Sequence, residues 1–321
     1  MITDFVDILK EVNKERSFDE LGDRSKYIGS SDVSGCPRRT VLSKLNHVDH
    51  NTETVIRFER GKIAELMFEP VFKKLIEMKD IVDFRPQFDI AYADNEHFKA
   101  HIDFLIKNTD NSFTVVEMKT VSNIPEKPYD SWMNQVCWQL GLLKSQYPNV
   151  NVFGSVLILD LNTGLYKYNN SIEFNQYLFD NVLKPKAELI LDSLKSNTLP
   201  RCEPDGLCAY CPFTKDCPAM QIKDKDYLQI QDADLEQQIA ELKSKQEYVK
   251  ELDKEIKQLN NIIKPMAVKV GKFNVGKYYV SAKSYVSSKF DTDAFKQSDP
   301  DGYKKYLKEL EQVRLTIKEV K

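Results

Sequence analysis

The spacing of apolar residues changes several times along the chain, and each spacing predicts a different kind of element. Apolar residues at every third or fourth position predict helices over 3–14, 55–78, 131–145 and about 172–195. Runs of strand formers predict strands over 88–93, 101–106 and 113–120, and a hairpin over 152–169 that turns at Asn162, Thr163 and Gly164. Within 27–45, Ser and Asp precede the apolar positions Val41, Leu42 and Leu45, which predicts a capped helix. Together these elements predict an α/β fold.

The pattern changes in character after residue 225. Apolar residues then follow one another at intervals of 4, 3, 7, 3, 4, 3 and 4, namely Leu235, Ile239, Leu242, Val249, Leu252, Ile256, Leu259 and Ile263. This heptad seam lacks one core position and predicts a long helix that ends at Pro265 and pairs with the body or with another subunit. Beyond it we expect a β-ribbon over 272–290 turning near Gly276, a capped helix over 291–310 and a last strand over 313–320. The chain is therefore predicted to form two domains, 1–225 and 226–321.

Composition narrows the class of protein. The chain has 321 residues, 41% of them hydrophobic, which is enough for a substantial core. The N-terminus, MITDFVDILKEVNKE, lacks the apolar stretch of a secretory signal, and no apolar run reaches membrane-spanning length. We therefore expect a cytoplasmic protein with no membrane partner. Residues 264–321 carry 12 Lys and 1 Arg against 7 Asp and Glu in a chain of net charge −3, and this basic tail favours a polyanionic partner.

The segment VVEMKT, residues 115–120, places a carboxylate and an amine on one face of a predicted strand. Side chains alternate along a strand, so Glu117 and Lys119 point the same way. Alone, this is also the pattern of a strand with a charged outer face. Asp103 lies on the preceding strand, in the pattern D-x13-E-x-K, and antiparallel pairing would bring it beside Glu117. Two adjacent carboxylates repel unless a cation lies between them, so the pair predicts a Mg²⁺ or Mn²⁺ site.

Four groups complete the predicted catalytic site. Glu65 follows Gly61 on a predicted helix and can add a third carboxylate to the metal. The main-chain carbonyl oxygen of Met118 can serve as a further ligand. Lys119 can stabilise developing charge or orient a water that the metal has made acidic. Gln135, on the next helix, can hydrogen-bond the lysine or the attacking water.

The cysteines form a second pattern. Cys208-x2-Cys211-x5-Cys217 lies in a segment rich in Pro and Gly, where tight turns present three thiolates to one centre. The fourth ligand is either the local Cys202 or the distant Cys36. Because disulfides are rare inside cells, these cysteines are expected to bind metal. Cys137 lies on the predicted helix of Gln135 and reads as a small core residue.

The ordered motifs resemble the PD-(D/E)xK nuclease superfamily, and within it the YqaJ, lambda-exonuclease-like branch of viral recombination nucleases. The resemblance covers residues 24–220 and includes the helix segment MNQVCWQLGLL and an IGSSD segment with an Arg seven residues before its Ser. It implies a restriction-endonuclease-like core, a central mixed sheet flanked by helices. It also implies that Arg24 and Ser31 bind a 5′-phosphate, which would set a 5′→3′ polarity. RecB-like relatives usually have His where this chain has Glu65 and Tyr where it has Gln139, so both residues favour the lambda-like branch.

The cysteines resemble a different set of relatives. Iron–sulfur nucleases of the AddB and CRISPR-associated types carry an early Cys-Pro-Arg context and a late C-x2-C-x5-C, and this chain has both. The resemblance implies a 4Fe–4S cluster on Cys36, Cys208, Cys211 and Cys217, with Cys202 a spare thiol. The role implied is structural, because the cluster would tether the segment of the phosphate pocket to the end of the nuclease core.

These features predict a Mg²⁺- or Mn²⁺-dependent deoxyribonuclease, an exonuclease that makes single-stranded ends for phage-type recombination or DNA repair in a bacterial or phage-infected cell. Its expected partners are DNA, a single-strand annealing protein or recombinase, and further copies of itself. One alternative is a nuclease that trims prespacers in CRISPR adaptation. The other is a non-catalytic nuclease fold that binds DNA ends.

Overall fold

The chain divides into two compact units, Met1–Leu235 and Glu236–Lys321. The computed structural model describes residues 5–46, 48, 50–221, 230, 232–283 and 290–306. Within these ranges no helix is both long enough and apolar enough to cross a membrane.

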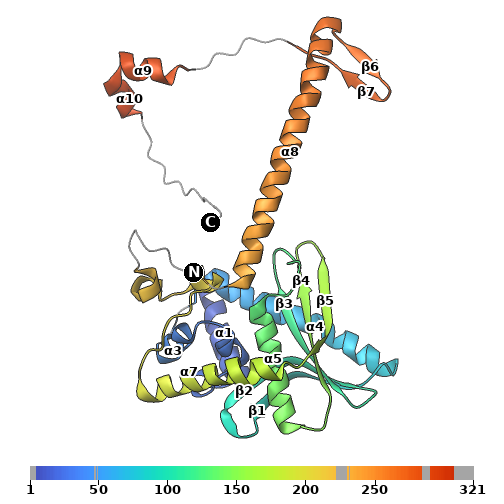
Figure 1. The fold of residues 1–321 in the computed structure, drawn as a ribbon, viewed down its shortest axis with the longest axis vertical. Coiled ribbons are helices and arrows are strands. Elements are labelled where there is room, and N and C mark those ends of the chain that lie inside the picture. Colours follow the sequence, from blue (N-terminus) through green and yellow to red (C-terminus); the bar gives the residue numbers. More distant parts are fainter. Residues whose placement is uncertain are drawn as a thin grey trace. The chain divides into compact units, whose positions relative to one another are not determined.

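A five-stranded sheet forms the centre of the first unit (Figure 1). Its strands are β1 (Ile81–Tyr92), β2 (Asn95–Asn108), β3 (Phe113–Thr120), β4 (Val152–Leu159) and β5 (Tyr166–Glu173), and they lie side by side in chain order. The β3–β4 pair is parallel and the other pairs are antiparallel, so the sheet is mixed. The predicted α/β architecture with a central mixed sheet is confirmed.

Helices cover both faces of this sheet. The helical elements of the unit are α1 (Phe5–Leu21), η1 (Arg24–Lys26), α2 (Ser30–Val33), α3 (Pro37–Leu45), α4 (Thr52–Glu77), α5 (Asp130–Gln146), α6 (Gln176–Leu178), η2 (Phe179–Leu183), α7 (Lys184–Ser196), η3 (Gly206–Tyr210), η4 (Thr214–Asp216) and η5 (Pro218–Met220). One core joins α5, α7, α2 and α3 to the sheet, around the fully buried Trp138 and Ile158. The other core lies between α4 and the opposite face, around Phe72 and Phe104. Apolar residues of the central strands β2, β3 and β4 therefore face both layers, whereas β1 and β5 are largely exposed or half-buried.

Several predicted boundaries are wrong for physical reasons. The helix predicted over 3–14 continues to Leu21 because polar contacts, which apolar spacing cannot reveal, hold its second half against α4. Asn13 and Arg16 both donate to Glu59, at 2.7 and 2.8 Å. The helix predicted from 172 begins later, because β5 extends to Glu173 and Asn175 then accepts a capping hydrogen bond from Leu178 N. A π-helical turn, η2, interrupts it before α7 begins.

The caps predicted within 27–45 also differ. Asp32 lies inside the short helix α2 and accepts from Gly29 N at 2.8 Å, so it serves that helix and not α3. Cys36 is the N-cap of α3, with Pro37 in the first turn, where the missing N–H of proline costs nothing. Strands β1 and β2 are longer than predicted, because they pair as one extended hairpin.

The second unit is mostly the helix α8 (Ala233–Val270), which begins just inside the first unit. It continues through Pro265, so the predicted end at that residue is wrong. A ribbon that turns at Gly276 (φ 56°) is confirmed as β6 (Phe273–Val275) and β7 (Tyr278–Val280), but it is shorter than the predicted span 272–290, of which residues 284–289 lie outside the described residues. The helix predicted over 291–310 is divided into α9 (Thr292–Ser298) and α10 (Pro300–Lys305), because Asp299 caps the second. The predicted strand 313–320 lies outside the described residues.

Candidate active site

The residues predicted to bind the divalent cation, the substrate phosphate or the attacking water all line one cleft of the first unit. The cleft has a volume of about 2080 Å³ and extends between α1, α4, the sheet and α5. The predicted residues that line it are Arg24, Ser31, Glu65, Asp103, Glu117, Met118, Lys119 and Gln135. Segments far apart in the sequence thus contribute side chains to the same cleft.

Strand β3 and helix α5 hold the centre of this cleft. Glu117 is only 6% exposed, so it is not on a solvated outer face of the strand. Lys119 Nζ lies 2.5 Å from Glu117 Oε1 and donates to Gln135 Oε1 at 2.7 Å. Gln139, one helical turn after Gln135, donates to Glu117 Oε2 at 2.6 Å. Two glutamines of α5 therefore hold this ion pair: Gln135 accepts from the amine and Gln139 donates to the carboxylate.

Asp103 is turned toward β3 by an irregularity in β2. Ile102 packs in the core on the α5 side and Phe104 in the core on the α4 side, so the alternation of side chains changes at Asp103. Bends of this kind re-aim side chains beside functional sites. Asp103 Oδ2 accepts from Met118 N at 2.8 Å, which ties the carboxylate to the residue after Glu117. The antiparallel pairing of β2 with β3 is as predicted.

Glu65 reaches the same cleft from α4. Its neighbours Glu59 and Glu69 have other partners, Arg16 and Lys73, and Glu65 itself accepts from Gln87 Nε2 at 2.5 Å. Gln87 has φ 47°, a left-handed conformation that is unfavourable for a residue with a side chain. Such strain is retained where surrounding structure enforces it, often at functional sites.

The three carboxylates are electrostatically coupled. Burial, and then the charge of Glu117, raises the pKa of Glu65 to about 7. Burial, followed by the charges of Glu117 and Glu65, also raises the pKa of Asp103 well above its ordinary value. Burial acts against the charged form of Lys119, but Glu117 and Asp103 outweigh it and raise the pKa of the lysine. The cleft therefore gathers three carboxyl groups, whose negative charge is partly offset by the ammonium groups of Lys119 and Lys62.

This donor set fits a divalent cation in its chemistry. Carboxylate and carbonyl oxygens are the ligands that Mg²⁺ and Mn²⁺ take, and a cation would relieve the repulsion that raises these pKa values. As the side chains stand, no group of three or more His, Cys, Asp or Glu residues in the described part of the chain is arranged to hold a metal ion.

Arg24 and Ser31 meet at another wall of the cleft. Arg24, in η1, donates through Nη2 to Ser31 Oγ at 2.9 Å. Ser31 is the second residue of α2 and Gly29 is the N-cap, so Ser31 is not itself the cap of a helix. The buried ammonium of Lys44 holds the main chain of residues 24–27 in place, because it donates to the carbonyls of Arg24 and Tyr27 at 2.6 and 2.8 Å.

Sequence reasoning did not assign functions to Gln87 and Gln139. Gln139 is 1% exposed, and its Oε1 has no partner among the described residues. The available signal was its spacing of four from Gln135, which places both amides on one helix face. Gln87 gave no signal, because its position depends on the backbone irregularity of the β1–β2 hairpin.

His101 also lines the cleft, where Tyr27 and Asp89 engage its two ring nitrogens.

Replacing Gln139 with leucine is expected to lower the turnover of any metal-dependent reaction in this cleft roughly 10- to 100-fold, the usual cost of removing a group that orients a metal ligand. The substitution keeps the volume but leaves Glu117 Oε2 buried without its donor. Turnover and the Mn²⁺ concentration for half activity would be measured together. Gln146→Leu, on the exposed end of the same helix, is the control. Unchanged values for Gln139→Leu would show that Glu117 needs no such support.

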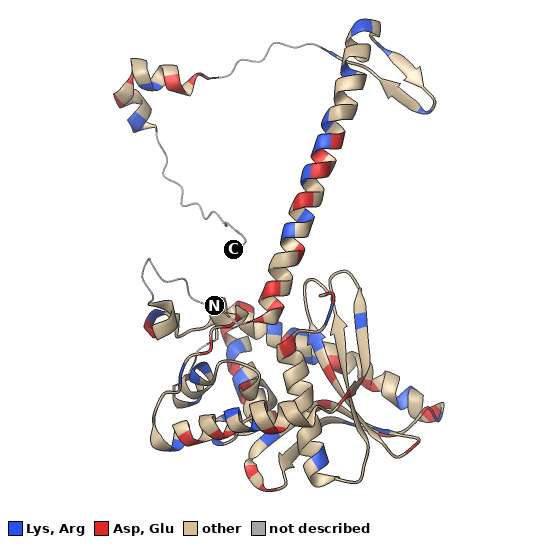
Figure 2. Cartoon of the chain, viewed as in Figure 1, with Lys and Arg blue, Asp and Glu red and all other residues tan. Residues whose placement is uncertain are grey.

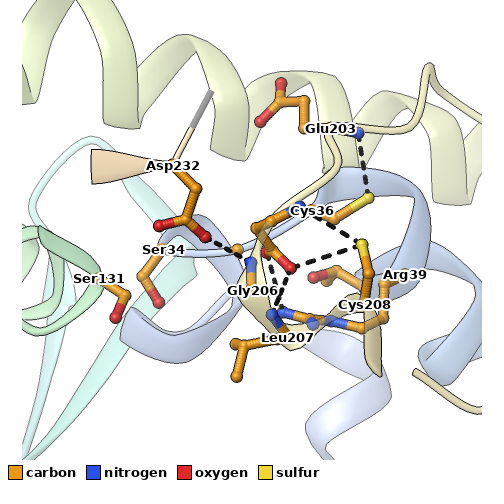
Figure 3. Close-up of polar contacts among 12 residues, drawn as sticks. Ser34, Cys36, Arg39, Ser131, Glu203, Gly206, Leu207, Cys208 and Asp232 are labelled. Atoms are coloured by element: carbon orange, nitrogen blue, oxygen red, sulfur yellow. Dashed lines mark hydrogen bonds and ion pairs between the residues drawn. The ribbon is translucent and has the colours of Figure 1, made fainter. Parts of the chain in front are cut away.

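Five of the six cysteines line a second, small cavity of about 30 Å³: Cys36, Cys202, Cys208, Cys211 and Cys217. The sixth, Cys137, lies in the core as predicted, and burial raises the pKa of its thiol to about 11. Glu203 N donates to Cys36 Sγ and Asp205 N donates to Cys208 Sγ, both at 3.3 Å (Figure 3). Arg38 lines the cavity too, and its buried Nε has no partner in the described part of the chain. Soft thiolates that accept N–H hydrogen bonds fit a zinc or iron–sulfur centre.

One short segment connects the two cavities. Ser31 accepts from Arg24, Ser34 Oγ accepts from Gln135 Nε2 at 3.3 Å, and Cys36 lies in the cysteine cavity. The late cysteine segment is anchored as well, because Gly206 N donates to Asp232 (Figure 3). Residues 31–36 thus contribute side chains to both cavities.

Comparisons with known proteins find a relative of similar length. The uncharacterized protein YqaJ of Bacillus subtilis (strain 168) is 28% identical over 327 residues, which cover 96% of each chain. No family model matches the sequence. Among solved structures, the protein SSO0001 has a TM-score of 0.47 at 16% identity, over 68% of this chain and 98% of that one. An alkaline exonuclease from Laribacter hongkongensis, LHK-Exo, has a TM-score of 0.38 at 15% identity, over 56% and 93%. The chain is thus similar in sequence to YqaJ over nearly its whole length.

Proposed function

We propose that the protein is a divalent-metal-dependent DNA exonuclease. The observation that carries this proposal is the convergence of Glu65, Asp103 and Glu117 with Lys119 in one cleft. A binding protein gains nothing from three coupled carboxylates facing a negatively charged substrate. A phosphodiester hydrolase needs them, because they hold the cation that neutralises the phosphate.

Each residue then has a distinct task. Glu65, Asp103, Glu117 and the carbonyl of Met118 would hold Mg²⁺ or Mn²⁺, which supplies an activated water and polarises the scissile phosphate. Lys119, held charged by its acidic neighbours, stabilises negative charge on the phosphate in the transition state. Gln135 fixes the direction of the lysine ammonium by accepting from it, and Gln139 holds Glu117.

A direct test is digestion of a 5′-labelled duplex in the presence of Mg²⁺. An exonuclease is expected to release the label as mononucleotides or short products from one end, with no activity in excess EDTA. Trimming confined to a few terminal nucleotides would favour the CRISPR-adaptation alternative. Tight binding of DNA ends without any cleavage in Mg²⁺ or Mn²⁺ would contradict the proposal and support the non-catalytic alternative.

We further propose that attack proceeds from the 5′ end. A guanidinium grips a terminal phosphate through two parallel hydrogen bonds, and Arg24 with Ser31 presents donors within the same cleft as the carboxylates. A nuclease that degrades one strand in this direction leaves a 3′ single strand. The partner consistent with that product is a single-strand annealing protein or a recombinase, in phage-type recombination or repair.

Arg24→Ala is expected to erase a preference of at least about tenfold for 5′-phosphate over 5′-hydroxyl ends, since a charge-assisted hydrogen-bond pair contributes about 1.5–3 kcal/mol. The rates on the two ends would be compared in single-turnover assays. Lys26→Ala removes a positive charge from the same 3₁₀ turn but outside the cleft, so it should keep the preference. Equal rates on both ends in the unmodified enzyme would contradict the polarity and leave the nuclease assignment standing.

The cysteine cavity is proposed to hold a 4Fe–4S cluster on Cys36, Cys208, Cys211 and Cys217. The proposal is supported by the soft donor set, the hydrogen bonds to two of its sulfurs and the shared cavity. Its role would be to fix the segment that carries Ser31 and Ser34. The cluster takes no part in hydrolysis.

A further inference from the structure

Helix α8 presents an apolar face that the rest of the described second unit leaves exposed. The helix is continuous over 38 residues, and the apolar side chains of this face are 36–58% exposed. Those on the face discussed below are Leu242, Val249, Leu252, Ile256, Leu259, Ile263, Met266 and Val270. A helix of this length is stabilised mainly by burying its apolar face, so a partner for that face is expected.

The continuity of α8 through Pro265 gives its seam a strict seven-residue repeat. With Leu235 at a heptad position a, every seventh residue is aliphatic: Leu235, Leu242, Val249, Ile256, Ile263 and Val270. The d positions are Gln238, Lys245, Leu252, Leu259 and Met266. In this register Ile239 falls outside the seam. From Val249 to Val270 the a and d positions are all apolar, and an apolar seven-residue repeat of this kind favours a left-handed coiled coil.

The identities of the seam residues select the partner. From Val249 onward, β-branched residues occupy a positions and Leu or Met occupies d positions, the combination that favours parallel two-stranded coiled coils. We propose that α8 pairs with α8 of a second copy of this chain, in parallel and in register, along the face from Val249 to Val270.

The flanking positions are compatible with this pairing. In a parallel pair, a g residue lies beside the e residue of the next heptad on the other helix. Glu241 then lies beside Gln246, Tyr248 beside Asp253 and Glu255 beside Asn260, so no like charges face each other at these flanking positions. Lys245, at a d position, would face its own copy, and it lies outside the proposed face from Val249 to Val270. Pro265 falls at position c, on the outer side, where its missing hydrogen bond does not disturb the seam. Figure 2 shows charges of both signs distributed along α8, as expected of its outer faces.

The oligomeric state of the full chain tests the proposal. Sedimentation equilibrium at micromolar concentration should give twice the chain mass of 37.2 kDa. Ile256→Glu and Ile263→Glu each place a charge in the seam and should weaken dimerisation by roughly 100-fold or more. Val268→Glu is the matched control, since Val268 lies at outer position f and is 74% exposed, and it should remain dimeric. A monomeric unmodified chain, a trimer, or dimers that persist in both seam variants would overturn the proposal.

Orientation is tested separately by cross-linking. Val270→Cys at an a position should form a disulfide-linked dimer under mild oxidation, beyond any seen for the parent protein, because parallel helices bring the two copies of residue 270 together. In an antiparallel pair centred on the helix they would lie about 55 Å apart at 1.5 Å per residue. Val268→Cys is the control. A dimer that forms the link at 268 as well as at 270, or at neither, would overturn the parallel, in-register arrangement.

Discussion

Asp103→Asn is expected to lower the rate of Mg²⁺-dependent DNA cleavage by roughly three orders of magnitude or more, the usual cost of removing a central catalytic group. Asparagine keeps the shape of the side chain, and its oxygen can still accept from Met118 N. What is lost is the negative charge that would face the cation. The rate would be measured on a 5′-labelled duplex under single-turnover conditions.

The same substitution should leave the fold and DNA binding intact. Burial and the charges of Glu117 and Glu65 raise the pKa of Asp103, so its ionised form is disfavoured in the folded, metal-free protein. Removing that charge should keep or raise the melting temperature in EDTA and should not weaken DNA binding, because the carboxylates repel phosphate. Asp94→Asn, in the exposed turn before β2, is the control. Cleavage at the normal rate by Asp103→Asn would rule out this site.

The centre of the site was predictable because its residues follow local periodicities. Glu117 and Lys119 are two apart on a strand, and Gln135 lies on the next helix, so alternation and helical spacing place them correctly. Asp103 needed only the assumption that β2 and β3 pair in antiparallel fashion.

The remaining contacts depend on features that have no such period. Gln87 meets Glu65 because its backbone adopts a positive φ, and the second half of α1 is held by polar contacts to Glu59. The break between β5 and α7 depends on a single cap at Asn175 and a π-helical turn. Irregular backbone and long-range polar contacts of this kind follow from tertiary packing, which overrides local propensity.

The spacing of the cysteines leaves two choices for the fourth ligand of the cluster, Cys36 and Cys202. Both line the cavity together with the three late cysteines. Their surroundings differ. Cys36 is 8% exposed and its Sγ accepts from Glu203 N, whereas Cys202 is half-buried. Arg39 also pairs with Asp205 at 3.8 Å, which draws the helix of the early cysteine toward the late segment. These contacts favour Cys36 as the fourth ligand.

Cys36→Ser is therefore expected to remove most of the iron and the brown chromophore from anaerobically purified protein, while Cys202→Ser retains both. A ligand shared between Cys36 and the late cysteines closes a loop of about 170 residues, so its loss should lower the free energy of unfolding by up to about 4 kcal/mol. Because the same segment carries Ser31 and Ser34, Cys36→Ser should also reduce the preference for 5′-phosphate ends. Absorbance, metal content and thermal unfolding would be measured on all three proteins.

Loss of the chromophore in Cys202→Ser alone would move the fourth ligand to the local site. Zinc in place of iron in the unmodified protein would contradict the iron–sulfur assignment, since four thiolates also suit a single zinc ion.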